Sequence, residues 1–265
     1  VTTMAMFPAF DFYERGNLEK VLAELSRIQQ ENHSLGATLE EDIRIYVAFS
    51  YLSLGKLGQA EQIFRKLQDA SSRNDALAMV ALTRNDFQSL ARYSKLLVGK
   101  NDDLDTTVPP ILQARAGFLD LARKGIAIRQ SRTQYSLGFL EAMQGEVILA
   151  GGQTAKAIPV LKKAVEHLTG THKRTYYLAL DSLSTALERE GRTAEAVGVL
   201  DTAMQSDSGK VLDTAYEWMR VEWKRAQLHR KLQEPETAQK IEGELRKRLA
   251  FADPDHPILT QLNHM

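Results

Sequence analysis

The chain has 265 residues, of which 43% are hydrophobic and 26% charged, a balance typical of a folded globular protein and not of a disordered one. Its 34 basic and 34 acidic residues cancel, which argues against a nucleic-acid-binding protein, because such proteins carry a basic excess. The absence of cysteine excludes disulfides, thiolate catalysis and cysteine-ligated zinc. No apolar run reaches the roughly 20 residues that span a bilayer, so we expect no membrane insertion by this chain.

A short pattern recurs along the chain and predicts helical hairpins. Each copy has one helix, a turn, and a second helix whose apolar residues fall on one face at i, i+4 and i+7. In the clearest copy the turn is at Gly55, and Ala60, Phe64 and Leu67 follow it on the second helix. The predicted turns lie, in chain order, at Gly16, Gly55, Asn85, Gly117, Gly152, Gly191 and Gln233.

These turns divide the chain into seven predicted hairpins and a tail. The hairpins cover roughly residues 2–34, 41–70, 71–100, 107–130, 133–168, 173–204 and 211–250. The tail, residues 254–265, contains two prolines and is expected to form a short capping helix. Because repeated hairpins bury their apolar faces against their neighbours, we expect one all-α solenoid domain over residues 1–265.

The hairpins resemble the tetratricopeptide repeat, whose period is about 34 residues. The resemblance rests on Ala48, Tyr51, Gly55, Ala60 and Phe64 in the second hairpin. It implies a right-handed α-solenoid that acts by binding a protein or peptide partner.

The last half of the chain has a second, looser resemblance, to the C-terminal repeat regions of large bacterial signalling proteins. In those proteins a Ser/Thr kinase or a winged-helix regulator precedes the repeats. The resemblance rests on residues 157–161 and 178–183, on Trp223, and on the closing residues 252–259. It implies a scaffold or sensor within a larger bacterial signalling or regulatory protein. The chain has no Gly-rich kinase loop and no His-Arg-Asp segment, so any kinase activity would lie outside it.

No residue pattern predicts catalysis, a cofactor or a metal site. The six histidines do not have the spacing of metal ligands. Gly151 and Gly152 fit a turn better than a phosphate loop, because no lysine follows the second glycine directly. The aspartates at 102, 103 and 105 lack the glycine and glutamate of a calcium loop, and we interpret them as a solvated charge run. We therefore predict a non-enzymatic protein, with a helical-repeat enzyme of unrecognised site as an alternative.

The family resemblance also implies a binding surface, because the first helix of each such hairpin lines a concave groove. The positions that would face a ligand hold apolar residues in the earlier hairpins and basic and aromatic residues in the last one. These groove candidates are Ile45, Phe49, Met79, Phe139, Arg220, Trp223, Gln227 and Arg230. The alternative is that the apolar candidates pack against neighbouring hairpins or are covered by the ends of the chain.

Trp223 is the strongest of these candidates. Residues 220, 223, 227 and 230 are three or four apart and share one helix face, whereas Trp218 and Met219 serve the buried stripe of the same helix. We expect an exposed Trp223 beside Arg220 and Arg230, in contact with an acidic or aromatic segment of a partner, since Trp and Arg dominate binding hot spots. A core role for Trp223 is the alternative.

The sequence leaves the compartment and the assembly state open. We expect a soluble chain and favour the cytoplasm, with an extracytoplasmic place if the parent protein is anchored in a membrane. Homo-oligomerisation through the uneven end hairpins is an alternative function, because terminal repeats without polar caps tend to self-associate.

Overall fold

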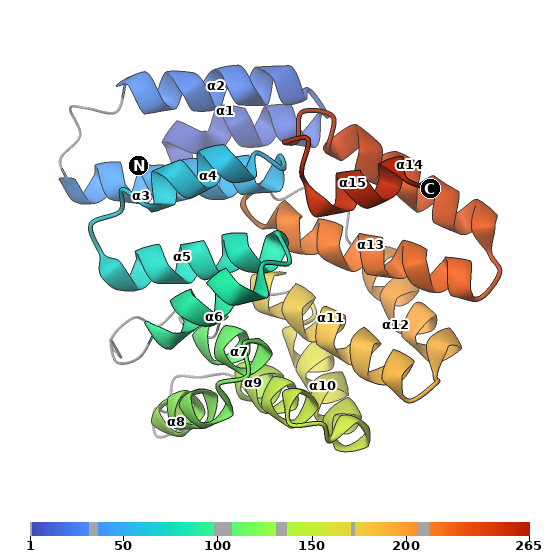
Figure 1. Ribbon diagram of the computed structural model, residues 1–265. Helices are drawn as coiled ribbons and strands as arrows, with labels where there is room; N and C mark the ends of the chain where they lie inside the picture. Colours follow the sequence, from blue (N-terminus) through green and yellow to red (C-terminus); the bar gives the residue numbers. More distant parts are fainter. Residues whose placement is uncertain (1, 32–36, 98–107, 131–136, 171–172, 206–211) are drawn as a thin grey trace.

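The computed structural model describes residues 2–31, 37–97, 108–130, 137–170, 173–205 and 212–265, and in these ranges it contains helices and no strand. The helices form seven consecutive hairpins arranged in a curved array (Figure 1). The first four hairpins are α1 (Thr2–Glu14) with α2 (Leu18–Glu31), α3 (Ala37–Ser53) with α4 (Leu57–Phe64), α5 (Ala70–Thr83) with α6 (Phe87–Lys95), and α7 (Val108–Arg115) with α8 (Leu119–Gln130).

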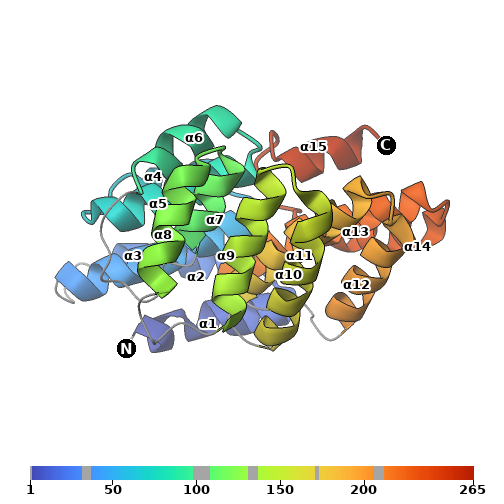
Figure 2. The same ribbon diagram turned by 90° about the horizontal axis from the view of Figure 1, so that it is seen from below.

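The second part of the array has three longer hairpins and a terminal helix. The hairpins are α9 (Leu137–Ala150) with α10 (Thr154–Leu168), α11 (Lys173–Arg189) with α12 (Thr193–Gln205), and α13 (Ala215–Lys231) with α14 (Pro235–Arg248). The short 3-10 turn η2 (Leu212–Thr214) precedes α13, and α15 (Pro257–Asn263) ends the chain. Figure 2, a view from below, shows α15 at one edge of the molecule. The predicted all-α solenoid with a short terminal helix is confirmed. The charged run at 102–105 lies outside the described residues.

Every predicted hairpin turn contains a residue in the left-handed region of the backbone map. The five glycines at these turns have φ between 72° and 86°. Asn85 and Gln233 have φ of 57° and 62°, and they are the only non-glycine residues with positive φ in the described part of the chain. Since most side chains disfavour this conformation, the turn residue fixes where each hairpin folds back.

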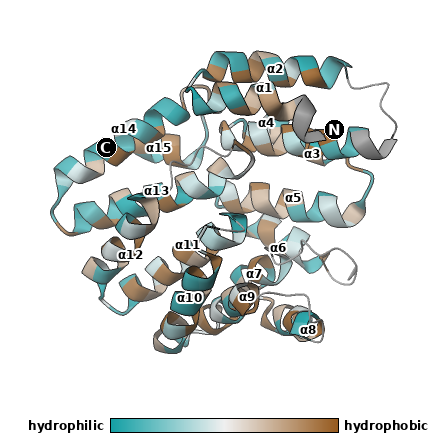
Figure 3. Ribbon diagram, turned by 180° about the vertical axis from the view of Figure 1, so that it is seen from behind, coloured by the Kyte–Doolittle hydropathy of each residue, from teal (hydrophilic) through white to brown (hydrophobic). Residues whose placement is uncertain are grey.

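Burial distinguishes the two helices of a hairpin. The second helix α2 is buried on one face only, at Leu18, Val21, Leu25 and Ile28. The first helix α11 is buried without interruption from Thr175 to Ser184, because other helices surround it. The extensive burial of α11 shows that this first helix lies in the interior of the array, whereas α2 has one face outside it. Figure 3 shows that most helices carry both hydrophobic and hydrophilic residues.

The curved array closes on itself, so that the last hairpin lies against the first two (Figure 1). Tyr216 of α13 stacks on Phe49 of α3, with ring centroids 5.9 Å apart. The Asp253 N–H donates to the Gly55 carbonyl at 3.0 Å, and the Asp253 carboxylate accepts from the Gly58 N–H at 2.8 Å. The two Asp253 contacts join residues almost 200 positions apart, 195 for the pair Gly58 and Asp253.

Candidate functional site

A cavity of about 250 Å³ lies where the closure brings α5, α11, α13 and α15 together. Four of the eight groove candidates line it, and they come from two hairpins that are far apart in the sequence: Met79, Arg220, Trp223 and Gln227. The sequence pattern predicts that these residues lie on the inner face, but the closure of the array is what brings α5 next to α13. We refer to this space as the central cavity.

The central cavity has an apolar floor and a polar rim. Met79 and Met219 on the floor are each 1% exposed. Asn85 and Gln261 at the rim are exposed, and Gln227 is half-buried. The site is therefore suited to an apolar group that enters the cavity and a hydrogen-bonding group that stays at its mouth.

Trp223 is 9% exposed, so the prediction of an exposed tryptophan is wrong. Its indole Nε1–H donates to Gln261 Oε1 of α15 at 3.1 Å. The sequence periodicity of α13 puts Trp223 off the predicted buried stripe, but every residue from Ala215 to Trp223 except Arg220 is buried in the structure. Periodicity alone does not show that a helix from the end of the chain covers this position. Trp218, predicted as buried, is 6% exposed.

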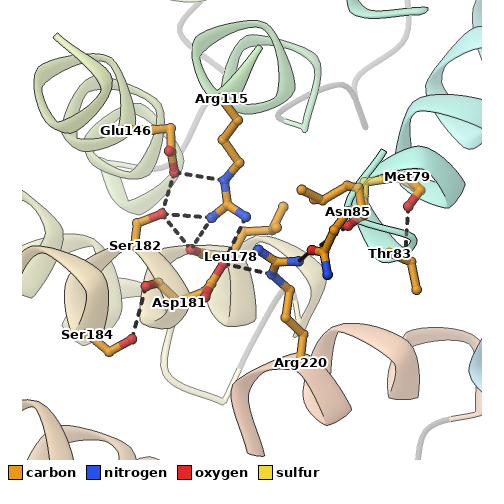
Figure 4. Close-up of polar contacts among 11 residues, drawn as sticks. Met79, Thr83, Asn85, Arg115, Glu146, Leu178, Asp181, Ser182, Ser184 and Arg220 are labelled. Carbon is orange, nitrogen blue, oxygen red and sulfur yellow. Dashed lines mark hydrogen bonds and ion pairs between the residues drawn. The ribbon is translucent and has the colours of Figure 1, made fainter. Parts of the chain in front are cut away.

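Arg220 connects three helices at the edge of the central cavity (Figure 4). Its Nε donates to Asp181 of α11 at 3.0 Å. Its Nη1 donates to the Leu82 carbonyl at 3.3 Å and to Asn85 Oδ1 at 3.4 Å. The guanidinium is half-buried and already engaged, so it holds α5, α11 and α13 in place as well as lining the cavity.

Asp181 is the centre of the buried polar network behind Arg220 (Figure 4). Arg115 of α7 donates to Asp181 at 2.9 Å and to Ser182 at 2.8 Å, and its Nε lies 3.3 Å from a carboxylate oxygen of Glu146. Burial by itself raises the pKa of Asp181, but the charges of Arg220 and Arg115 outweigh it and lower the pKa to about 2. Asp181 is thus ionised at neutral pH and serves as an ion-pair centre, not as a proton donor.

Arg230 does not line the central cavity, contrary to the prediction that it lies beside Trp223. Its guanidinium makes two hydrogen bonds of 2.7 Å to Glu242 of α14. Arg230 contacts α14 because it lies near the turn at Gln233, where the chain folds back into that helix. A long side chain there reaches the neighbouring helix of its own hairpin.

Three apolar candidates also lie outside the cavity lining. Phe49 is 8% exposed and packs between Phe64, at 4.9 Å between ring centroids, and Tyr216, with the Arg174 guanidinium 4.2 Å from its ring centre. Phe49 thus packs against its own hairpin and the last hairpin, in line with the alternative that the apolar candidates pack against other hairpins. Ile45 and Phe139 are half-buried and pack against the core.

His256, which directly precedes α15, lines the central cavity but is not among the sequence candidates. It is 1% exposed, and neither ring nitrogen has a hydrogen-bond partner in the described part of the chain. Burial lowers its pKa to about 4, although the nearby charges of Asp253 and Asp255 act in the opposite direction. The histidine is therefore neutral at pH 7. Its sequence context, a proline turn near the end of the chain, gives no sign of this burial.

Two kinds of site find no support among the described residues. No group of three or more His, Asp or Glu side chains there could hold a metal ion. No helix in the same ranges has the length and hydropathy needed to cross a membrane.

Comparison with known proteins identifies the fold. No family model and no curated protein matches the sequence. A tetratricopeptide repeat protein from Parabacteroides merdae ATCC 43184 matches 99% of this chain and 98% of its own, with a TM-score of 0.52 and 10% identity. A chain of the APC/C Cut9–Hcn1 hetero-tetramer matches over 95% of this chain and 47% of its own (TM-score 0.49, 14% identity). A chain of Naa15/Naa10 bound to HypK-THB matches over 100% of this chain and 39% of its own (TM-score 0.38, 16% identity). The chain thus has the fold of tetratricopeptide-repeat proteins.

Proposed function

We propose that the chain is a non-enzymatic helical-repeat scaffold, a single superhelical domain that binds a protein or peptide partner at the central cavity. The observation that carries the proposal is the convergence of Met79, Arg220, Trp223 and Gln227 on one concave site. With α15 as its outer wall the cavity has a volume of about 250 Å³, below the roughly 300–1,000 Å³ of small-molecule sites, which favours a partner segment over a free small molecule.

The titratable groups around the cavity favour binding over catalysis. General acid–base catalysis works best with a group whose pKa lies near the working pH. Asp181 has a pKa of about 2 and His256 of about 4, and the two arginines next to Asp181 are occupied by ion pairs. Of the other titratable side chains in the lining, Glu217 is paired with Arg174 and Lys224 with Glu188.

A wider role rests on the looser resemblance of the last half of the chain. We propose that the scaffold belongs to a larger bacterial signalling or regulatory protein in the cytoplasm. The sequence of the complete parent protein tests this, because a kinase or winged-helix domain before residue 1 supports the proposal and an unrelated domain contradicts it.

Partner binding is tested by selecting peptides from a display library on the immobilised chain. Thr185→Arg places a long cation at the half-buried rim, and the matched control Thr237→Arg makes the same change on the exposed part of α14. Selected peptides should lose about tenfold or more in affinity with Thr185→Arg, as expected for a blocked pocket, and none with the control. Peptides that bind Thr185→Arg as tightly as the wild type would place the site elsewhere.

A further inference from the structure

The outer wall of the central cavity is α15, a helix with the composition of a ligand segment. Its sequence, Pro-Ile-Leu-Thr-Gln-Leu-Asn, contains no charged side chain. Pro257, Ile258 and Gln261 line the cavity. Gln261 accepts from Trp223 at 3.1 Å and from Gln227 at 3.5 Å. The helix therefore already occupies the surface that a partner would have to contact.

The charges around the cavity favour an uncharged occupant of this kind. Arg220 pairs with Asp181 at 3.0 Å, Arg174 pairs with Glu217 at 3.0 Å, and Lys224 pairs with Glu188. A charged segment would have to compete with these pairs and lose its hydration on entry. Amide groups at the rim, in contrast, offer both donors and acceptors to a neutral segment.

The attachment of α15 is modest. Leu262 is its one fully buried side chain, and Ile258 and Leu259 are half-buried against the core. Arg246 of α14 donates to the Leu262 carbonyl and, at 3.0 Å, to Asn263 Oδ1. A helix of seven residues is marginal by itself, and the unpartnered nitrogens of His256 weaken the docking further, because buried polar atoms lose their water.

The closure of the array has contacts outside α15. Asp253 fastens the preceding loop to Gly55 and Gly58, and this residue lies before the first turn of the helix. Leu249 at the end of α14 is fully buried as well. The contacts of Asp253 with Gly55 and Gly58 therefore involve no residue of α15.

Resting on the proposed function, we infer that α15 is an intramolecular occupant of the partner site. The partner presents a short uncharged helix with an aliphatic residue and a glutamine three positions apart, as Ile258 and Gln261 are in α15. Such spacing places both on one helix face, the arrangement by which helical peptides bind grooves. Because α15 must leave before this partner enters, the free chain is closed and its apparent affinity is reduced.

Displacement of α15 can be measured without a partner. Trp218→Phe leaves Trp223 as the single tryptophan, located beneath Gln261. In this background Leu262→Asp charges the buried anchor of α15, and Thr260→Asp adds the same charge at an exposed position of the same helix. Acrylamide quenching of Trp223 should rise at least about twofold with Leu262→Asp and stay unchanged in the control. Unchanged quenching, or loss of cooperative thermal unfolding with Leu262→Asp, would show that α15 is a fixed part of the fold.

The occupant is tested with a fluorescein-labelled peptide of residues 256–265 added to the full chain. The peptide should bind the Leu262→Asp chain about tenfold or more tightly than the wild type, whose own α15 competes, and an Ile258→Asp peptide should not bind. Equal affinity for both chains would contradict the competition.

A stable wild-type dimer in light scattering would indicate that α15 of a second copy binds the site, and it would overturn the proposal that a separate partner does so. If the peptide competition gives the expected result but the library selection yields no binding peptide, α15 is an occupant of the site and the proposed partner binding is contradicted.

Discussion

At the scale of single residues, Trp223 shows how a candidate binding side chain can be part of the protein interior. Its indole is enclosed by α13 and α15 and makes one hydrogen bond to Gln261. Trp223→Ala should therefore lower the free energy of unfolding by about 3 kcal/mol, as expected for removal of a buried aromatic side chain. Urea unfolding measures this. Gln261→Ala, which removes only the hydrogen bond, should cost about 1 kcal/mol or less. A loss below about 1 kcal/mol for Trp223→Ala would instead favour an exposed binding role.

Asp181 is the residue whose charge matters most for the interior of the array. Its pKa is about 2 in the folded chain, against 3.8 for an unperturbed aspartate, and the lowered value means that the folded state favours the ionised form. This contributes about 2.5 kcal/mol of stability above pH 4, which is lost as the pH falls from about 4 to 2. Asp181→Asn should abolish this part of the acid dependence in unfolding measurements between pH 2 and 5. An unchanged dependence would assign it to other carboxylates.

At the scale of helices and turns, the sequence is most informative where structure is local. Gly55 and Asn85 indicate turns because a positive φ is costly for most other residues. The conformation of each turn depends only on the few residues that form it, so it can be predicted from the local sequence. Predictions fail where a contact depends on distant segments. Trp223 is covered by α15, and His256 becomes buried by the same docking, neither of which follows from helical periodicity. The prediction that Arg230 lines the cavity is wrong for a different reason, because its long side chain reaches Glu242 of α14 instead.

The docking of α15 should depend on pH through His256. Its pKa is about 4 when docked, against 6.5 for an unperturbed histidine, so the undocked form binds more protons between these values. Docking is fully stable above about pH 6.5 and weakens by up to about 3 kcal/mol as the pH falls towards 4. The charged groups nearby are Asp253 and Asp255 of the same loop, Glu217, Arg220 and Lys224 of α13, and Asp181 of α11.

Quenching of Trp223 in the Trp218→Phe background measures this dependence. It should rise between pH 6.5 and 4 in the parent chain and stay flat in His256→Leu, which cannot take up the proton. A rise of the same size in His256→Leu would assign the effect to a group other than His256.

At the scale of the whole molecule, the closure turns an open repeat array into a ring-like one (Figure 1). The central cavity lies between α5, α11, α13 and α15. An open solenoid gains stability only from neighbouring repeats. Here the stacking of Phe49 on Tyr216 and the Asp253 hydrogen bonds add contacts between the first and last parts of the chain. Residues from α5 and α13 can share one site for this reason, so the closure is a condition for the proposed function.

Gly55 gives a direct test of the closure. It has φ +72°, and a Cβ there would lie 2.5 Å from the Cβ of Ala252 in the docked loop. Gly191 is a matched control, since it has φ +73° at an equivalent turn and a Cβ there would meet nothing within 4 Å. Both changes to alanine should cost about 1 kcal/mol for the backbone conformation.

Gly55→Ala should cost about 1–3 kcal/mol more than Gly191→Ala, because the loop must also move away. Urea unfolding gives both costs, and small-angle scattering should show a larger radius of gyration for Gly55→Ala alone if the last hairpin separates from α3 and α4. Equal losses of stability and unchanged scattering in the two variants would show that the turn at Gly55 tolerates the extra methyl group.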